Sequence, residues 1–190
     1  MISDFGDPRF GWRCEPKHWS LADGVLTIQP DAPTDFWCKT HYGFEADNGH
    51  FRYVKIGGDF RLSAEIFMTP QAQYDQAGLM VRVSKSCWLK TSIEYEPGAK
   101  NRLGVVVTNA GYSDWSTQDV APSVNRFRLR VARAGDDYLV EASLDGEEWT
   151  QIRLAHLQEA GEVACGVYAC SPKSTGFCAE FRNLVIAPSS

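Results

Sequence analysis

Apolar and polar residues alternate with a period of two through much of this chain. Between Phe60 and Met68 every even position is apolar, whereas the odd positions are mostly polar. The same alternation runs through 127–131 and 138–144. Because successive side chains of a strand point to opposite faces, this pattern predicts strands that bury one face and expose the other.

Turn signals separate the alternating runs at short intervals. Asp23-Gly24 and Asp145-Gly146 favour tight hairpins because these residues tolerate positive φ. We expect about twelve strands and no long helix, with at most one short helical turn over 154–161. A few of the fourteen candidate strand segments are expected to be loops, and the segments are 19–21, 25–28, 35–38, 50–56, 59–68, 76–84, 87–95, 102–109, 114–119, 126–134, 137–144, 148–154, 162–169 and 176–186.

Many short strands with regular turns predict an all-β domain, either a sandwich or a barrel. A length of 190 residues fits one such domain, and no linker or fixed-period repeat interrupts the sequence. We therefore expect residues 1–190 to form a single domain.

The charge of the chain argues against polyanionic partners. The formal net charge is −5 and no run of Lys or Arg is present, whereas nucleic acids and anionic membranes select basic surfaces. No apolar run is long enough to cross a bilayer. The first five residues lack a basic stretch followed by an apolar core, so we expect no secretory signal and a cytoplasmic location.

Cysteines and histidines show no metal-ligand spacing, and we predict neither a metal nor a cofactor. Asp47-Asn48-Gly49 carries oxygen ligands suited to Ca²⁺, but this tripeptide is more often a turn. The cysteines lack a C-x-x-C pair and are expected to be free, small buried residues in or beside strands. They are Cys14, Cys38, Cys87, Cys165, Cys170 and Cys178.

Several stretches taken together are similar to a known family. They are 34–44 (TDFWCKTHYGF), 47–51 (DNGHF), 74–82 (YDQAGLMVR), 88–95 (WLKTSIEY), 106–109 (VVTN) and 113–116 (SDWS). In this order they resemble a widespread family of unknown function that is also labelled "regulation of enolase", and the resemblance covers nearly the whole chain.

The resemblance implies a fold but no settled activity. Members of the family resemble concanavalin A-like lectins and glucanases, which implies two curved antiparallel sheets packed as a jelly roll with a concave surface. The family has carbohydrate-linked associations in bacteria and a proposed metabolic regulatory role in fungi. Either a carbohydrate or a metabolic enzyme is therefore a possible partner.

Parity along two neighbouring strands places a candidate binding face. If 76–84 and 87–95 pair as a hairpin, their even-numbered side chains share one face, and this face is polar with embedded aromatics. Such a face suits sugars, which need paired donors and acceptors and an aromatic surface on which to stack. The candidate ligand-binding residues are Gln76, Arg82, Trp88, Lys90, Glu94 and Glu96 on the sheet, with Trp37, Tyr42, His50 and Trp115 at the rim.

Three other interpretations of this face stay open. The first is an ordinary solvated sheet face with cross-strand ion pairs such as Arg82 with Glu94. The second is a docking surface for a metabolic enzyme. The third is a glycan hydrolase or lyase that uses Glu94 with Lys90 or Arg82. Glu94 and Glu96 lie about 6.5–7 Å apart if both are on one strand, which permits glycosidase chemistry without establishing it.

Overall fold

The computed structural model describes residues 1–158 and 160–189, and within them it contains strands but no α-helix. One seven-stranded antiparallel sheet has the order β1 (Gly11–Arg13), β6 (His50–Gly57), β15 (Glu162–Cys170), β8 (Gln76–Ser84), β9 (Cys87–Glu94), β10 (Asn101–Asn109) and β11 (Tyr112–Val120). We call it the front sheet. Its strand order brings together segments far apart in the sequence, since β15 inserts between β6 and β8.

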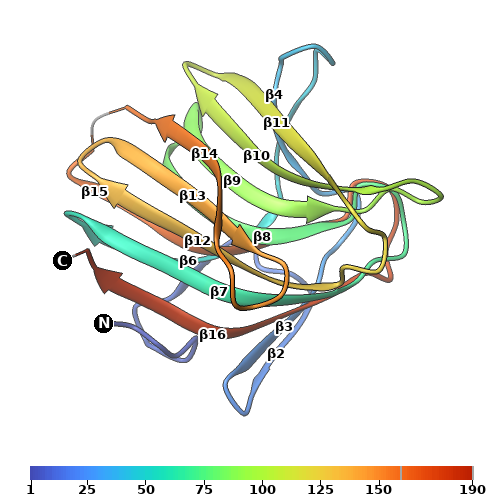
Figure 1. Ribbon diagram of the computed structural model, residues 1–190, viewed down its shortest axis with the longest axis horizontal. Helices are drawn as coiled ribbons and strands as arrows, with labels where there is room; N and C mark the ends of the chain where they lie inside the picture. The colour runs from blue at the N-terminus through green and yellow to red at the C-terminus, as the bar shows by residue number, and fades with distance from the viewer. Residues whose placement is uncertain (159, 190) are drawn as a thin grey trace.

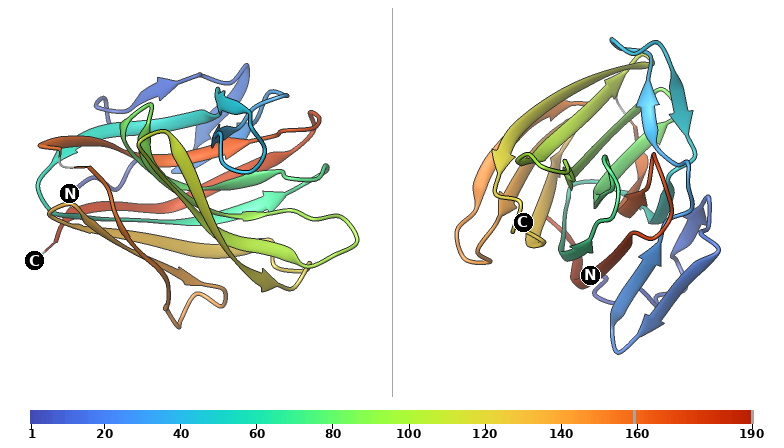
Figure 2. Two further views of the ribbon diagram at one scale, coloured as in Figure 1. Left: turned by 90° about the horizontal axis from the view of Figure 1, so that it is seen from above. Right: turned by 90° about the vertical axis from the view of Figure 1, so that its right-hand side faces the viewer.

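A second seven-stranded antiparallel sheet, the back sheet, packs against the first (Figures 1 and 2). Its order is β14 (Thr150–His156), β13 (Asp137–Ser143), β12 (Arg126–Ala134), β7 (Phe60–Thr69), β16 (Cys178–Pro188), β3 (Val25–Gln29) and β2 (His18–Ala22). A separate hairpin joins β4 (Phe36–Cys38) to β5 (Glu45–Asp47). The predicted all-β, two-sheet antiparallel sandwich is therefore confirmed.

The main core lies between the two sheets, where the alternating residues of each sheet meet. The even positions of β7, including Leu62, Ala64 and Ile66, are buried there. The odd positions of β9, including Leu89 and Ile93, face them from the front sheet. The period of two along 60–68 thus identifies the buried face correctly.

A second, smaller core lies on the outer, concave face of the front sheet. Its members come from β4 of the hairpin and from five strands of the sheet, and they are Phe36, Trp37, Cys38, Phe51, Met80, Trp88, Val106, Tyr168 and Cys170. Cys38 is tied to β11 by a hydrogen bond from its backbone N–H to Ser113 Oγ (2.9 Å). The hairpin therefore covers part of a face that sequence parity alone would leave in solvent.

Some local predictions differ from the structure. Leu154 to His156 continue strand β14, so the predicted helical turn is wrong over these residues, and residue 159 of that segment lies outside the described residues. The short strands β1 and β5 were not predicted, because three residues carry too little pattern. Cys14 is exposed and Cys178 only half-buried, in contrast to the buried cysteines that we expected.

Candidate functional site

Strands β8 and β9 pair as the sequence suggested. Their register places Gln76 opposite Glu94 and Arg82 opposite Trp88, so the even-numbered residues share the concave face. Gly78 sits in the middle of the pair, where a Cβ atom would come within 1.8 Å of the Thr91 carbonyl oxygen. Only glycine permits this approach of the two strands.

An aromatic ridge divides that face into two ends. The ring of Phe36 packs 6.2 Å from Trp88 and 6.1 Å from Tyr168, measured between ring centroids. Trp88 is 1% exposed and donates its indole N–H to the Lys85 carbonyl. Trp88 is therefore part of the ridge and does not reach the solvent-filled space on either side.

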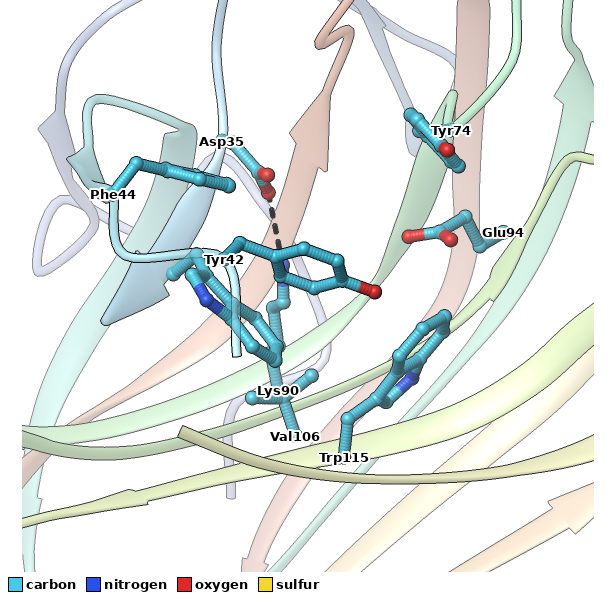
Figure 3. Close-up of a pocket in the computed structure, with 9 residues that line it drawn as sticks. Asp35, Tyr42, Phe44, Tyr74, Lys90, Glu94, Val106 and Trp115 are labelled. Carbon is cyan, nitrogen blue, oxygen red and sulfur yellow. Dashed lines mark hydrogen bonds and ion pairs between the residues drawn. The ribbon is translucent and has the colours of Figure 1, made fainter. Parts of the chain in front are cut away.

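At one end of the face a pocket of about 180 Å³ opens between the hairpin and the sheet (Figure 3). We call it the aromatic pocket. Its walls come from the hairpin, from the β7–β8 loop and from β9, β10 and β11. The lining residues are Asp35, Trp37, Tyr42, Phe44, Tyr74, Lys90, Glu94, Val106 and Trp115.

A hydrogen-bonded chain of polar groups forms the floor of the aromatic pocket. Lys90 Nζ donates to Asp35 Oδ1 (3.1 Å) and to Gln76 Oε1 (2.9 Å). Gln76 in turn donates its Nε2 to Glu94 Oε2 (3.1 Å) and accepts from the Tyr168 hydroxyl (3.1 Å). The buried ammonium of Lys90 is thus paired, as a charge removed from water must be.

The carboxyl group of Glu94 holds a proton at neutral pH. Burial raises the pKa of Glu94 to about 8, and the nearby carboxylates of Asp35 and Glu96 add to the rise. The ammonium of Lys90 opposes this shift without cancelling it. Below about pH 8 the pocket therefore contains a carboxylic acid that can both donate and accept a hydrogen bond.

Aromatic side chains surround this polar floor. The ring centroid of Tyr42 lies 5.4 Å from that of Trp37 and 6.2 Å from that of Phe44, so the β4–β5 hairpin presents three rings side by side. Trp115 faces them from β11 (Figure 3), lying over Gly104, where a Cβ atom would come within 2.7 Å of its indole nitrogen. Trp115 and Tyr42 keep 37% and 56% of their surface exposed, which leaves ring surface open to a ligand.

A buried carboxylate anchors the loop that carries Tyr74. Asp75 is fully buried, and its Oδ2 accepts hydrogen bonds from the backbone N–H groups of Gln71 and Ala72 (2.8 Å each). Tyr74 has a positive φ of 74° and donates its N–H to the Tyr95 carbonyl. The ring of Tyr74 is thus held at the pocket edge by its backbone.

The other end of the concave face is built around Arg82. Its guanidinium makes two hydrogen bonds to the carboxylate of Asp47 (2.8 and 3.1 Å), and Arg13 binds the same carboxylate at 2.5 Å. The cross-strand pair of Arg82 with Glu94 is therefore wrong, because Glu94 pairs with Gln76 at the opposite end. Arg82 lines a second hollow of about 220 Å³, which we call the basic hollow.

The remaining candidate residues do not line the aromatic pocket. His50 is buried and accepts a hydrogen bond at Nε2 from the Asp31 N–H (2.9 Å), while its Nδ1 bonds the Cys14 carbonyl. Glu96 lies beyond the end of β9 and accepts from Gln73 Nε2 (2.9 Å). Among the described residues no group of His, Cys, Asp and Glu side chains is arranged to hold a metal ion.

Sequence reasoning missed part of the lining, because the pocket forms between distant segments. Asp35, Phe44, Tyr74 and Val106 were not proposed, although all four lie in the stretches that carry the family resemblance. The ion pair of Asp35 with Lys90 joins residues 55 positions apart, and no periodic pattern signals such a contact. The four aromatic positions of 36–44 were the available clue.

Comparison with known proteins finds one family model and one curated relative. The family model, described as "Protein of unknown function (DUF1349)", matches residues 12–189. The relative is "Regulation of enolase protein 1" of Saccharomyces cerevisiae, which is 36% identical over 172 residues, covering 90% of this chain and 86% of the relative.

Solved structures agree with the fold. A functionally unknown protein from Saccharomyces cerevisiae superposes with a TM-score of 0.92 at 32% identity, covering 99% of this chain and all of the other. The carbohydrate-binding module CBM66 from Bacillus subtilis matches with a TM-score of 0.60 at 13% identity over 93% of this chain and 94% of the module. The K247S mutant of the GH43 protein BlXynB from Bacillus licheniformis matches with a TM-score of 0.76 at 17% identity, covering 98% of this chain and 39% of the other.

Proposed function

Since this chain belongs to the DUF1349 family, whose description names no activity, we propose its function from the site itself: the chain binds a sugar or sugar derivative in the aromatic pocket. The observation that carries the proposal is the combination of aromatic walls with a hydrogen-bonding floor. The apolar face of a sugar ring stacks on aromatic side chains, and its hydroxyls require both donors and acceptors. Trp115 and Tyr42 offer the aromatic stacking surfaces, and Glu94 with Asp35 offers the hydrogen-bond donors and acceptors.

The charge of the floor favours a neutral ring over an anionic one. Lys90 is paired with Asp35, and Glu94 is protonated at neutral pH, so the floor has no unpaired charge. An anionic sugar would meet the Asp35 carboxylate without a free cation to compensate it. Neutral monosaccharides, or neutral rings at the end of a chain, therefore fit best.

The names of structural neighbours support a carbohydrate ligand without specifying it. One neighbour is a carbohydrate-binding module, and another is a GH43 protein. Both share the fold of this chain at low identity, so they supply a precedent for the architecture rather than for particular contacts.

A ligand screen with one matched pair of variants tests the proposal. Neutral monosaccharides and short oligosaccharides are titrated against the protein and followed by thermal shift and by NMR. We expect Trp115→Ala to weaken binding roughly tenfold, because it removes a stacking surface. Trp149→Ala is the control, since Trp149 packs on Arg130 of the back sheet. If no neutral sugar binds the wild type, or if both variants bind equally, the proposal fails.

Acid catalysis is a second candidate, favoured by the protonated state of Glu94 in the aromatic pocket. Glu94 would act as a general acid and Lys90 would position the substrate, which makes the chain a glycan hydrolase or lyase. Arg82 takes no part in this mechanism because it lies at the other end of the concave face. Turnover of aryl glycosides that Glu94→Gln abolishes, while the sugar still binds, would establish catalysis; binding without turnover would leave the binding function alone.

Regulation of a metabolic enzyme is compatible with the same surface. The curated relative is named for regulation of enolase, and the aromatic pocket exposes large rings, among them Tyr42 and Trp115. Protein interfaces are enriched in such aromatics. Co-purification from lysate with wild type and with Tyr42→Ala tests this placement, and a partner that binds both equally would exclude the rim as its docking site.

A further inference from the structure

We propose that the basic hollow is a second binding site, which takes a small oxyanion: the carboxylate or phosphate group of a metabolite. It lies on the same concave face as the aromatic pocket, beyond the ridge of Phe36, Trp88 and Tyr168. The aromatic pocket shares no lining residue with it, so the inference does not depend on sugar binding.

Three cationic side chains from three strands line the basic hollow. The register places Ala164 of β15 opposite Arg82 of β8 on one side and opposite Lys55 of β6 on the other. Residues directly opposite each other in adjacent strands share a face, so Arg82 and Lys55 flank the small methyl group of Ala164. Arg13 of β1 supplies the third cation, and the short side chain of Ala164 leaves room between the three.

The positive charges of the hollow exceed the carboxylates that face them. Arg82 and Arg13 share the single carboxylate of Asp47, which is not itself among the lining residues. Lys55 has no close acidic partner within the described residues, although Glu162 also lines the hollow. Positive charge is therefore left over at this site.

The chemistry of these groups selects an oxyanion. A guanidinium presents its N–H groups in a planar fork that matches carboxylate and phosphate oxygens, and a lysine adds a point charge. Asp47 holds Arg82 in place, so little ordering is required on binding. The net charge of −5 on the whole chain disfavours a nucleic acid, so a small anion fits the hollow better than a polymer does.

Titration with two simple probes tests the site and distinguishes its two possible ligands. Inorganic phosphate and acetate are added separately to the full chain at constant ionic strength and followed by ¹⁵N–¹H NMR. We expect saturable shifts at the amides of Val163 and Ala164. A response to phosphate alone assigns a phosphate ester, and a response to acetate alone assigns a carboxylate. No saturable shift with either probe, or shifts confined to other strands, would overturn the proposal.

Charge-removing variants that should not disturb folding make the test specific. Lys55→Gln and Arg13→Gln each remove one proposed ligand and leave the pair of Arg82 with Asp47 intact. We expect about tenfold weaker anion binding for each, the usual consequence of losing one charge-assisted hydrogen bond. Lys100→Gln is the control, because it removes the same charge from an exposed loop outside both sites.

Two comparisons separate this site from general charge attraction and from the aromatic pocket. Anion binding that falls equally in Lys55→Gln and Lys100→Gln would reflect general charge attraction and would overturn the proposal. Trp115→Ala should bind the anion as the wild type does, even if that variant no longer binds a sugar. A loss of anion binding in Trp115→Ala would place the anion in the aromatic pocket and refute a second site.

Discussion

The two ends of the concave face both draw on the β8–β9 hairpin but differ in chemistry. One β8–β9 hairpin contains both register pairs, Gln76 with Glu94 and Arg82 with Trp88. At the first end the β4–β5 loop adds aromatic rings, and Glu94 becomes a neutral acid. At the second end β5 adds Asp47, whose carboxylate accepts two hydrogen bonds from the Arg82 guanidinium. The segments that cover a sheet face therefore decide its chemistry as much as its own residues do.

Removing the ridge should produce the largest effect, because it supports both ends. Trp88→Ala deletes a side chain that is 1% exposed, and we expect the free energy of unfolding to fall by about 3–5 kcal/mol. Urea unfolding measures this loss. Phe44→Ala is the control, since Phe44 lies in the β4–β5 loop with 45% of its surface exposed, and its loss should cost well under half as much. Equal losses in the two variants would contradict the proposed division of the face.

The ion pair at the charged end can be removed separately by substituting Asp47. Asp47→Asn leaves Arg82, whose side chain is 10% exposed, without its carboxylate, and we expect a loss of about 2–3 kcal/mol. Asp119→Asn, which breaks an exposed pair with Arg102, should cost less than about 1 kcal/mol. If the basic hollow binds oxyanions, added phosphate or acetate should restore part of the stability lost in Asp47→Asn. A variant as stable as Asp119→Asn would show that this pair does not order the face.

The aromatic end should show a pH dependence that follows from Glu94. Its folded pKa of about 8 lies above the ordinary 4.5, so between these values the folded state binds a proton that the unfolded state lacks. Stability contributed by this proton is complete below about pH 4.5 and is lost as the pH rises to about 8. Because one pKa unit corresponds to about 1.4 kcal/mol and water can enter on ionisation, we expect a change of roughly 2 kcal/mol.

Glu94→Gln provides the reference for this measurement, since glutamine does not titrate. The unfolding free energy of the wild type, relative to Glu94→Gln, should decline between pH 5 and pH 8 in urea titrations. A constant difference across this range would mean that Glu94 is ionised in the folded protein and that the pocket floor is negatively charged.

The smallest effect should come from substituting Gly104, the residue on which the Trp115 ring packs. In Gly104→Ala the new methyl group would come within 2.7 Å of the Trp115 indole nitrogen and 3.0 Å of the Ser116 carbonyl, so the ring must shift. We expect a stability loss of about 1 kcal/mol and weaker ligand binding in the aromatic pocket. Gly11→Ala is the control, because its Cβ would meet only ordinary contacts with Tyr53 at 3.8 Å. Unchanged sugar binding in Gly104→Ala would show that the position of Trp115 does not matter.

The sequence determined the class of fold and the parity of the central strands. Alternation along 60–68 and the turn dipeptides are local signals, because each of them spans only a few neighbouring residues of the chain. The same parity places Gln76, Lys90 and Glu94 on one face, because side chains two residues apart in a regular strand point to the same side of the sheet. These features required no knowledge of where distant segments lie.

Tertiary structure decided what those side chains meet. Whether Lys90 would be solvated or buried depended on Asp35, and whether Arg82 would meet Glu94 or Asp47 depended on where the β4–β5 hairpin folds over the sheet. The raised pKa of Glu94 likewise comes from burial by segments remote in sequence. Contacts between distant segments leave no periodic trace in a single chain, so only the assembled fold separates one polar face into an aromatic pocket and a basic hollow.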